Sequence, residues 1–326
     1  MALQLSITNL TFPALREQEL VAIAAAAGFA GVDFLDLWDG TGPLSRITYL
    51  DAGRRRRAAD EIRRTYEAHG VVLSDVYALF LEEVEGSPVP ALNAIEAADR
   101  ETARAWFEGV LEFAREAGAR GISIPTAVPP PLADNDAFER LVEEVAWRVE
   151  RGREANLSVS IEPTMNSIVF SPTKTEELLN RIPDLQLTVD QSHFTYHGFV
   201  ESDCAVLYAR ARHLHCRGAA KDHLQQPLSA STINYTYIVE ALAKVDYEGF
   251  LCCEAFSATG FFTFLDAVDI WHETIGLRNL LRDEIAAAER SGDLTAGGVS
   301  ASSPDDRPTL KPVRRLPRNT EYEQLQ

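Results

Sequence analysis

Basic residues, long apolar runs and paired cysteines are scarce in this chain, and each shortage narrows what the protein can be. Lysine and arginine number 31 against 49 aspartate and glutamate residues among 326, so the net charge is −18 and nucleic acid is disfavoured as a partner. No apolar run approaches the roughly 18 residues that a membrane helix needs, so we expect no membrane association. The four cysteines show no CxxC spacing, so we expect reduced core thiols and no disulfide framework.

The sequence also shows neither a secretory signal nor a clear phosphate-binding cluster. Residues 1–8 already form a strand-like run and lack the basic and then apolar layout of a secretory signal, so we expect a cytoplasmic protein. The densest basic cluster, four arginines at 54–57, stands early in a predicted helix that also carries Asp60 and Glu61. That mixture of charges favours a solvated helix face over a phosphate-binding site.

Short apolar runs alternate with amphipathic helical stretches over most of the chain. The runs predict strands at residues 3–8, 32–38, 71–79, 121–126, 157–162, 185–190, 213–217 and 250–254. Helices are predicted from about residue 17 and at about residues 52–69, 95–116, 136–154, 174–180, 203–210, 235–244 and 264–289. Alternation of strand and helix predicts parallel pairing, and eight such units over about 275 residues fit a closed (β/α)8 barrel.

The predicted fold class is therefore α/β, a (β/α)8 TIM barrel with a C-terminal extension. The barrel is assigned to residues 1–290, and the Pro/Gly-rich residues 291–326 are expected to form a tail or an oligomerisation arm. A doubly wound open sheet is the alternative, but residues 9–13 lack the glycine-rich phosphate turn that usually follows its first strand. Pro-containing loops at 81–93 and 127–134 are expected above the barrel mouth.

Residues that commonly bind metals stand at the ends of the last four predicted strands. They are Glu162, Asp190, His215 and Glu254. The carboxyl ends of parallel strands meet at one rim of a barrel, and three buried carboxylates there repel one another unless a cation offsets them. Three carboxylates and one imidazole make a hard, oxygen-rich donor set. The sequence therefore predicts one divalent metal ion, Mn²⁺ foremost, with Mg²⁺, Co²⁺ and Zn²⁺ as alternatives.

Several neighbouring residues are candidates for substrate contact. His193 lies three residues past Asp190, in the loop expected to leave that strand, and is predicted to orient a ligand or donate a proton; a surface histidine is the alternative. Arg217 shares a strand face with His215 and could hold a substrate oxygen or form a rim ion pair. His197, in a loop above the site, and Trp38, at a strand end, could contact substrate, with solvent and plain packing as their alternatives.

Three further residues in or near predicted strands are expected to serve mainly in packing. His213 lies two residues before His215 and is predicted to be a buried layer residue. Tyr77 and Phe256 stand near strand ends and could form apolar walls for a sugar, although plain packing is the more common role of such residues.

The four strand ends read Ile-Glu-Pro, Val-Asp-Gln-Ser-His, His-Leu-His-Cys-Arg and Cys-Glu-Ala-Phe, and together they resemble the xylose isomerase-like barrel superfamily. That superfamily includes ketose 3-epimerases, hydroxypyruvate isomerase, inosose dehydratase and one class of apurinic endonucleases. The resemblance covers about residues 3–279 and implies that Glu162, Asp190, His215 and Glu254 are the metal ligands, with His193 as a helper. It also implies that Glu162 and Glu254 act as an acid/base pair beside a sugar carbonyl, while the metal polarises that carbonyl.

The resemblance implies a metal-dependent sugar isomerase or epimerase that acts on a small-molecule sugar or glycoside. A nuclease is disfavoured, because the second and third strand ends, at 35–38 and 76–79, lack the extra histidines of a three-zinc site. The long segment 217–228 and the C-terminal tail suggest a specialised branch. One such branch is the large subunit of a C-glycoside deglycosidase, a lyase that cleaves 3-oxo-C-glycosides by deprotonation and elimination. We therefore expect a homo-oligomer, or a hetero-oligomer with a small subunit; a non-catalytic scaffold barrel is a further alternative.

Overall fold

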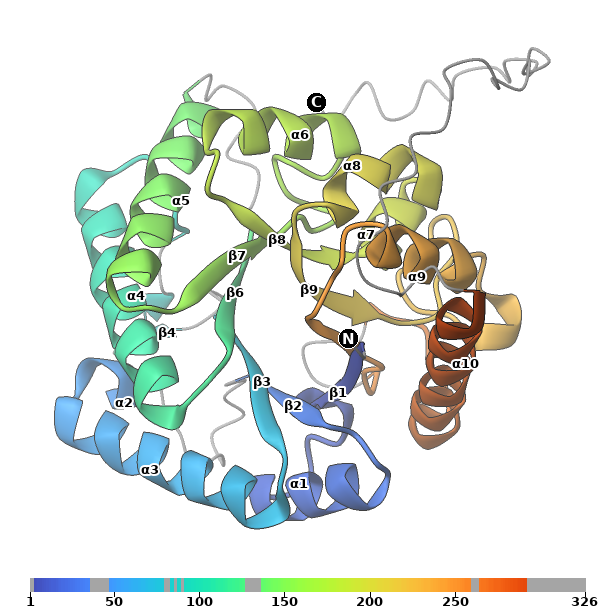
Figure 1. The fold of residues 1–326 in the computed structure, drawn as a ribbon. Coiled ribbons are helices and arrows are strands. Elements are labelled where there is room, and N and C mark those ends of the chain that lie inside the picture. The colour runs from blue at the N-terminus through green and yellow to red at the C-terminus, as the bar shows by residue number, and fades with distance from the viewer. Residues whose placement is uncertain are drawn as a thin grey trace.

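Eight parallel strands close into a barrel, which confirms the predicted α/β TIM barrel (Figure 1). The computed structural model describes residues 3–35, 47–78, 83–84, 87–88, 91–126, 136–258 and 264–291. Around the barrel the order is β1 (Gln4–Thr8), β10 (Phe250–Cys253), β9 (Ala211–Cys216), β8 (Gln186–Asp190), β7 (Ser158–Glu162), β6 (Gly121–Pro125), β3 (Val72–Tyr77) and β2 (Gly31–Leu35). The short strands β4 (Glu83–Val84) and β5 (Ser87–Pro88) pair with each other outside the barrel.

Helices surround the barrel and connect its strands (Figure 1). They are α1 (Glu17–Ala26), α2 (Ile47–Leu50), α3 (Ala52–His69), α4 (Ala97–Ala117), α5 (Ala137–Glu154), α6 (Pro172–Arg181), α7 (Gln191–Tyr196), α8 (Ala205–Tyr208), α9 (Tyr235–Ala243) and α10 (Ile270–Ser291). Capping residues determine where helices begin and end, as helix α3 shows. The Asp51 side chain caps α3 by accepting a hydrogen bond from the Arg54 N–H, and Gly70 ends that helix with a φ of 65°.

The main hydrophobic core lies between the strands and these helices. Outward-facing strand residues such as Val32, Val159 and Leu187 pack there against helix residues such as Leu141 and Leu178. The barrel interior, in contrast, is largely polar: Ser123, Ser160 and Thr188 form hydrogen bonds with one another across it. None of the helices in the described part of the chain combines the length and apolar composition that crossing a membrane needs.

Two helices differ from the sequence-based expectations. The last helix begins at Ile270, not near residue 264, because the Asp269 side chain caps it by accepting from the His272 N–H. The helix expected at 203–210 is a 3-10 turn (Glu201–Cys204) followed by the four-residue α8, since Asp203 binds back to the Val200 N–H. Trp38, the predicted mouth loop at 127–134 and residues 292–326 of the predicted tail lie outside the described residues, as do parts of the other predicted mouth loop at 81–93.

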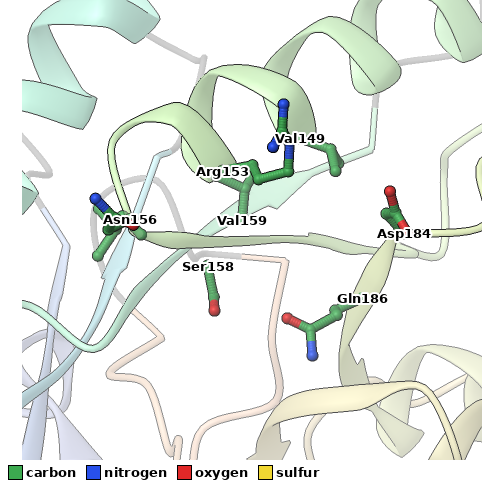
Figure 2. Close-up of a pocket in the computed structure, with 8 residues that line it drawn as sticks. Val149, Arg153, Asn156, Ser158, Val159, Asp184 and Gln186 are labelled. Atoms are coloured by element: carbon green, nitrogen blue, oxygen red, sulfur yellow. The ribbon is translucent and has the colours of Figure 1, made fainter.

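A surface pocket of about 300 Å³ lies between α5 and the starts of β7 and β8 (Figure 2). Its lining residues include Arg153, Asn156, Ser158, Asp184 and Gln186. Because Ser158 and Gln186 are the first residues of their strands, this pocket lies at the amino end of the barrel. Catalytic sites of TIM barrels lie at the opposite, carboxyl end, so the pocket is separate from the site described next.

Candidate metal centre

The structure brings the four predicted ligands together at the carboxyl end of the barrel. Each of Glu162, Asp190, His215 and Glu254 offers one ligand atom, and these atoms all lie within 4.8 Å of one another. All four side chains are buried, with His215 only 3% exposed. Ligand atoms around one ion with bonds of about 2.0–2.4 Å are separated by less than about 4.8 Å, so one cation can contact all four.

Strand register explains this convergence. Asp190 is the last residue of β8 and its Cα pairs with that of His215 on β9. Glu162 is the last residue of β7, and Glu254 follows β10 directly, with its N–H bonded to the Cys216 carbonyl of β9. Four neighbouring strands therefore each deliver one polar side chain to the same level of the barrel.

The carboxylate oxygens of the cluster contact His215 and Arg217. His215 Nδ1 lies 2.6 Å from Glu162 Oε1 and 3.4 Å from Glu254 Oε1. The Arg217 guanidinium donates to Asp190 Oδ2 at 2.6 Å and also to Glu254 Oε2. Arg217 itself is 4% exposed and lies over the Phe256 ring, 4.9 Å from its centroid. The predicted substrate-binding arginine thus contacts two of the four predicted ligands.

The charges of the cluster fit a divalent cation. With the protons of Glu254 and His215 removed, as metal binding requires, the three carboxylates carry three negative charges and Arg217 returns one positive charge, which leaves −2. A buried net charge of this size is costly unless it is neutralised. A divalent ion brings the sum to zero, so the residues present suit such an ion in both donor chemistry and charge.

The pKa values of the cluster reflect burial and crowding. Burial raises the pKa of Glu254 to about 8, although Arg217 and His215 oppose that rise. Burial also disfavours ionisation of Asp190, but its neighbours, the Arg217 guanidinium foremost, outweigh burial and lower the pKa of Asp190 to about 2. For His215, burial lowers the pKa while Glu254 and Glu162 raise it, and the balance lies well above its ordinary value.

His193 lies in helix α7 and not in a loop, because the Asp190 side chain caps that helix by accepting from the Ser192 N–H at 2.8 Å. Its Nδ1 accepts a hydrogen bond from the Met165 N–H at 3.0 Å, which puts the imidazole proton on Nε2. Nε2 is 3.6 Å from Asp190 Oδ2. Burial lowers the pKa of His193, so the ring is a neutral N–H donor that faces the cluster.

His197 is the residue that ends α7, and its Nε2 donates to the Met165 carbonyl at 2.7 Å. His193 and His197 therefore bind the backbone N–H and the backbone carbonyl of the same residue, Met165, which lies in the segment that follows β7. The ring of His197 also lies 4.6 Å from that of Phe170. Only Nδ1 of His197 is left for a substrate, so its predicted substrate contact stays a prediction.

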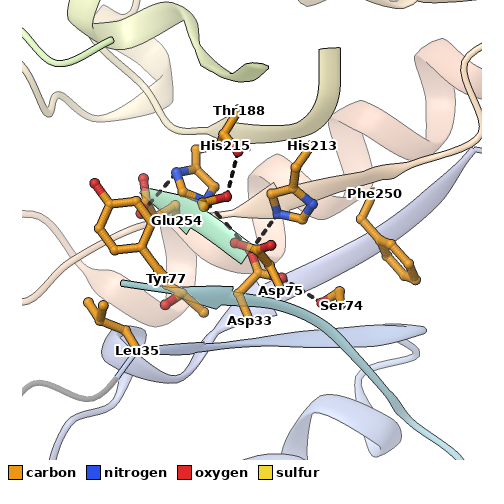
Figure 3. A network of polar contacts seen from close by, with 12 residues as sticks. Asp33, Leu35, Ser74, Asp75, Tyr77, Thr188, His213, His215, Phe250 and Glu254 are labelled. Carbon is orange, nitrogen blue, oxygen red and sulfur yellow. Dashed lines mark hydrogen bonds and ion pairs between the residues drawn. The ribbon is translucent and has the colours of Figure 1, made fainter. Parts of the chain in front are cut away.

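A buried polar layer lies under the cluster, and of its members the sequence predicted only His213 (Figure 3). His213 Nε2 lies 2.6 Å from Asp33 Oδ2, and Ser74 donates to the other Asp33 oxygen at 2.5 Å. Arg212 donates to Asp75 Oδ1 at 2.5 Å. His213 is thus a buried layer residue, as its position predicted. In the sequence, Asp33 and Asp75 are marked only as acidic residues inside apolar strands, because neither stands at a strand end.

Replacing Arg217 with methionine should destabilise the metal-free protein strongly, because Asp190 then loses its buried counter-charge and Glu254 loses a hydrogen-bond donor. Loss of one partner of a buried pair costs about 3–5 kcal/mol. We expect Mn²⁺ to recover most of the lost thermal stability, since the ion replaces the missing positive charge. Thermal unfolding with and without Mn²⁺ measures both effects.

Arg148→Met is the matched control for that experiment. Arg148 is fully buried and paired with Glu144 on α5, outside the metal centre. Its loss should also destabilise the protein, but Mn²⁺ should recover nothing. Equal recovery in both variants would show that the ion acts somewhere other than at Arg217.

Comparisons with known proteins support the same fold. A structure of 3-keto-D-glucoside 4-epimerase from E. coli is 15% identical, covers 86% of this chain and 99% of its own, and has a TM-score of 0.62. A D-allulose 3-epimerase from Methylomonas sp., solved with D-allulose, is 11% identical over 87% of this chain and 97% of its own, with a TM-score of 0.69. No curated protein sequence matches the chain significantly.

A third similar structure is a fusion of a xylose isomerase-like TIM barrel with 4-hydroxyphenylpyruvate dioxygenase. It is 15% identical over 93% of this chain, with a TM-score of 0.65, but the match spans 46% of the fusion protein. At these identities the structures establish a shared fold alone. The family is established separately, because a family model described as a xylose isomerase-like TIM barrel matches residues 21–281. The resemblance that the strand ends predicted is confirmed: the chain belongs to the xylose isomerase-like TIM barrel family.

Proposed function

We propose that this protein is a divalent-metal-dependent enzyme of the sugar isomerase or epimerase type. It removes a proton next to the carbonyl of a keto- or hydroxy-sugar and returns a proton to the product. The single observation that carries the proposal is the convergence of Glu162, Asp190, His215 and Glu254 on one buried point. The similar structures of a 3-keto-D-glucoside 4-epimerase and a D-allulose 3-epimerase support a sugar as the substrate.

Glu162 and Glu254 are the proposed acid/base pair. They approach His215 Nδ1 from different strands, at 2.6 Å and 3.4 Å, so they flank a common point. One carboxylate takes the proton from the carbon, and the other gives a proton back on the second face. A bound divalent ion, Mn²⁺ in our proposal, would supply Lewis acidity that stabilises negative charge on the substrate oxygens.

Arg217 and His193 are the proposed substrate-binding and proton-donating groups. Arg217 Nε is buried and has no hydrogen-bond partner among the described residues, so a substrate oxygen can accept from it. His193 presents its Nε2–H toward Asp190 at the edge of the same cluster. Both groups can donate to a carbonyl or hydroxyl oxygen without taking the proton that Glu162 or Glu254 transfers.

The test is solvent exchange into a sugar carbon. Mn²⁺-loaded protein is incubated in D₂O with a panel of ketoses and 3-keto-glucosides, and deuterium uptake is followed by NMR. We expect deuterium next to the carbonyl together with an epimer or isomer, and no exchange with Glu162→Gln. Complete absence of exchange and of new product with the metal-loaded wild type would refute the proposal.

A lyase that releases an aglycone from a 3-oxo-C-glycoside is a second candidate, and one observation favours it. Leu10, Leu35, Leu224, Phe256 and Leu265 form a buried apolar cluster, and Phe256 of this cluster lies against Arg217. Such a cluster beside the carboxylates suits an aromatic aglycone. The same D₂O experiment with an aryl 3-oxo-C-glycoside separates the candidates, because release of a phenol identifies a lyase and exchange without release identifies an epimerase.

A further inference from the structure

Tyr77 has a place in the metal centre that its position in the sequence did not reveal. It is the last residue of β3, and its ring packs against the apolar cluster of Leu10, Leu35, Leu224, Phe256 and Leu265. The ring centroid lies 5.6 Å from that of His215 (Figure 3). A tyrosine held in this way has little freedom to move its hydroxyl.

The Tyr77 hydroxyl donates a hydrogen bond to Glu162 Oε2. The other oxygen of the same carboxylate, Oε1, lies 2.6 Å from His215 Nδ1. The two oxygens of Glu162 therefore have different partners: Oε1 faces the predicted ligands, and Oε2 faces β3. The carboxylate is only 2% exposed, so no solvent competes for either oxygen.

We propose that Tyr77 is a positioning residue, which holds Oε2 of Glu162 so that this carboxylate binds the metal ion through Oε1 alone. A carboxylate without such a partner is free to rotate and bind an ion through both oxygens. One-oxygen binding keeps a coordination position for substrate and fixes the direction of the acid/base group. The proposal rests on the proposed metal-dependent function of Glu162, which it extends to a residue of another strand.

The chain contains a second bond of the same type that serves as a control. Tyr66 of α3 is 2% exposed, and its hydroxyl donates to Oε1 of the partly buried Glu17 of α1 at 2.5 Å. This pair joins two helices and includes none of the four predicted ligands. Tyr77→Phe and Tyr66→Phe therefore delete the same hydroxyl and the same kind of hydrogen bond, and each keeps its ring packing.

The experiment compares both variants with the wild-type full-length protein, using Co²⁺ as a spectroscopic probe. We expect Tyr77→Phe to change the visible absorption of the Co²⁺-loaded protein and to raise the Co²⁺ dissociation constant or lower kcat by about 10- to 100-fold. KM for an accepted sugar should change little, because the hydroxyl acts through Glu162. Tyr66→Phe should keep the Co²⁺ spectrum, the Co²⁺ affinity and kcat of the wild type.

Three outcomes would overturn the proposal. One is a Co²⁺ spectrum, affinity and kcat in Tyr77→Phe equal to those of the wild type. Another is an equal loss in both variants, which would mark a general effect on stability. The third is a wild-type protein that takes up no Co²⁺. A wild type that binds Co²⁺ and turns over no sugar overturns the proposed function alone, because the spectrum of Tyr77→Phe still decides the role of Tyr77.

Discussion

Glu254→Gln is expected to lower turnover by about a thousandfold or more while the fold stays intact. The substitution removes a metal-binding oxygen anion and one of the two proposed proton-transfer groups, and general acid–base catalysis alone contributes about 10²–10⁴-fold. The fold should survive because glutamine fills the same volume and remains uncharged. At its raised pKa of about 8, Glu254 of the metal-free protein is itself largely protonated at neutral pH.

Glu201→Gln is the matched control for this prediction. Glu201 is 8% exposed and accepts a hydrogen bond from the Asn234 N–H at 2.9 Å, outside the metal centre. Glutamine can accept the same bond, so both turnover and thermal stability should stay near the wild-type values. Steady-state kinetics measures the turnover of both variants, and circular dichroism measures their fold and thermal stability. Unchanged turnover in Glu254→Gln would remove Glu254 from the mechanism.

The affinity for a divalent ion should fall steeply as the pH is lowered from 8 to 6. In the metal-free protein the pKa of Glu254 is raised to about 8, so below that pH the carboxyl holds a proton that the metal must displace. The pKa of His215 is also raised well above its ordinary value, which adds a second proton. One displaced proton lowers the affinity about tenfold per pH unit, and two lower it about a hundredfold.

Isothermal titration with Mn²⁺ at pH 6, 7 and 8 measures this dependence directly. Over these two pH units the dissociation constant should rise by between about 10² and 10⁴ toward pH 6. In Glu254→Gln the metal should displace one proton fewer, because an amide does not titrate. The dissociation constant of this variant should therefore change less with pH than that of the wild type. An affinity that is constant between pH 6 and 8 would mean that neither Glu254 nor His215 is a ligand.

The parts of the fold that could be predicted from sequence are those that neighbouring residues determine. Strands such as Phe250–Cys253 are continuous apolar runs because both faces of a parallel barrel strand are covered. The helix at Ala52–His69 has its capping aspartate and its terminal glycine in the sequence itself. Polar residues at the ends of such runs indicated the four ligands, since parallel strands bring their carboxyl ends together.

Contacts across the barrel could not be predicted in the same way. Tyr77 and Glu162 are 85 residues apart, and Asp33 and His213 are 180 residues apart. Which side chains meet depends on barrel closure and strand register, and a one-residue shift in register turns a side chain to the other face. For the same reason the sequence suggested that Arg217 could hold a substrate but did not reveal its bonds to Asp190 and Glu254.

Metal content of the purified, untagged protein, measured by plasma mass spectrometry, tests the central claim most directly. We expect about one equivalent of a divalent ion per chain, with Mn²⁺ foremost, as purified or after incubation with Mn²⁺ and desalting. Near three equivalents of zinc would point to a nuclease. No bound metal after incubation would mean that the cluster of Glu162, Asp190, His215 and Glu254 is not a working metal centre.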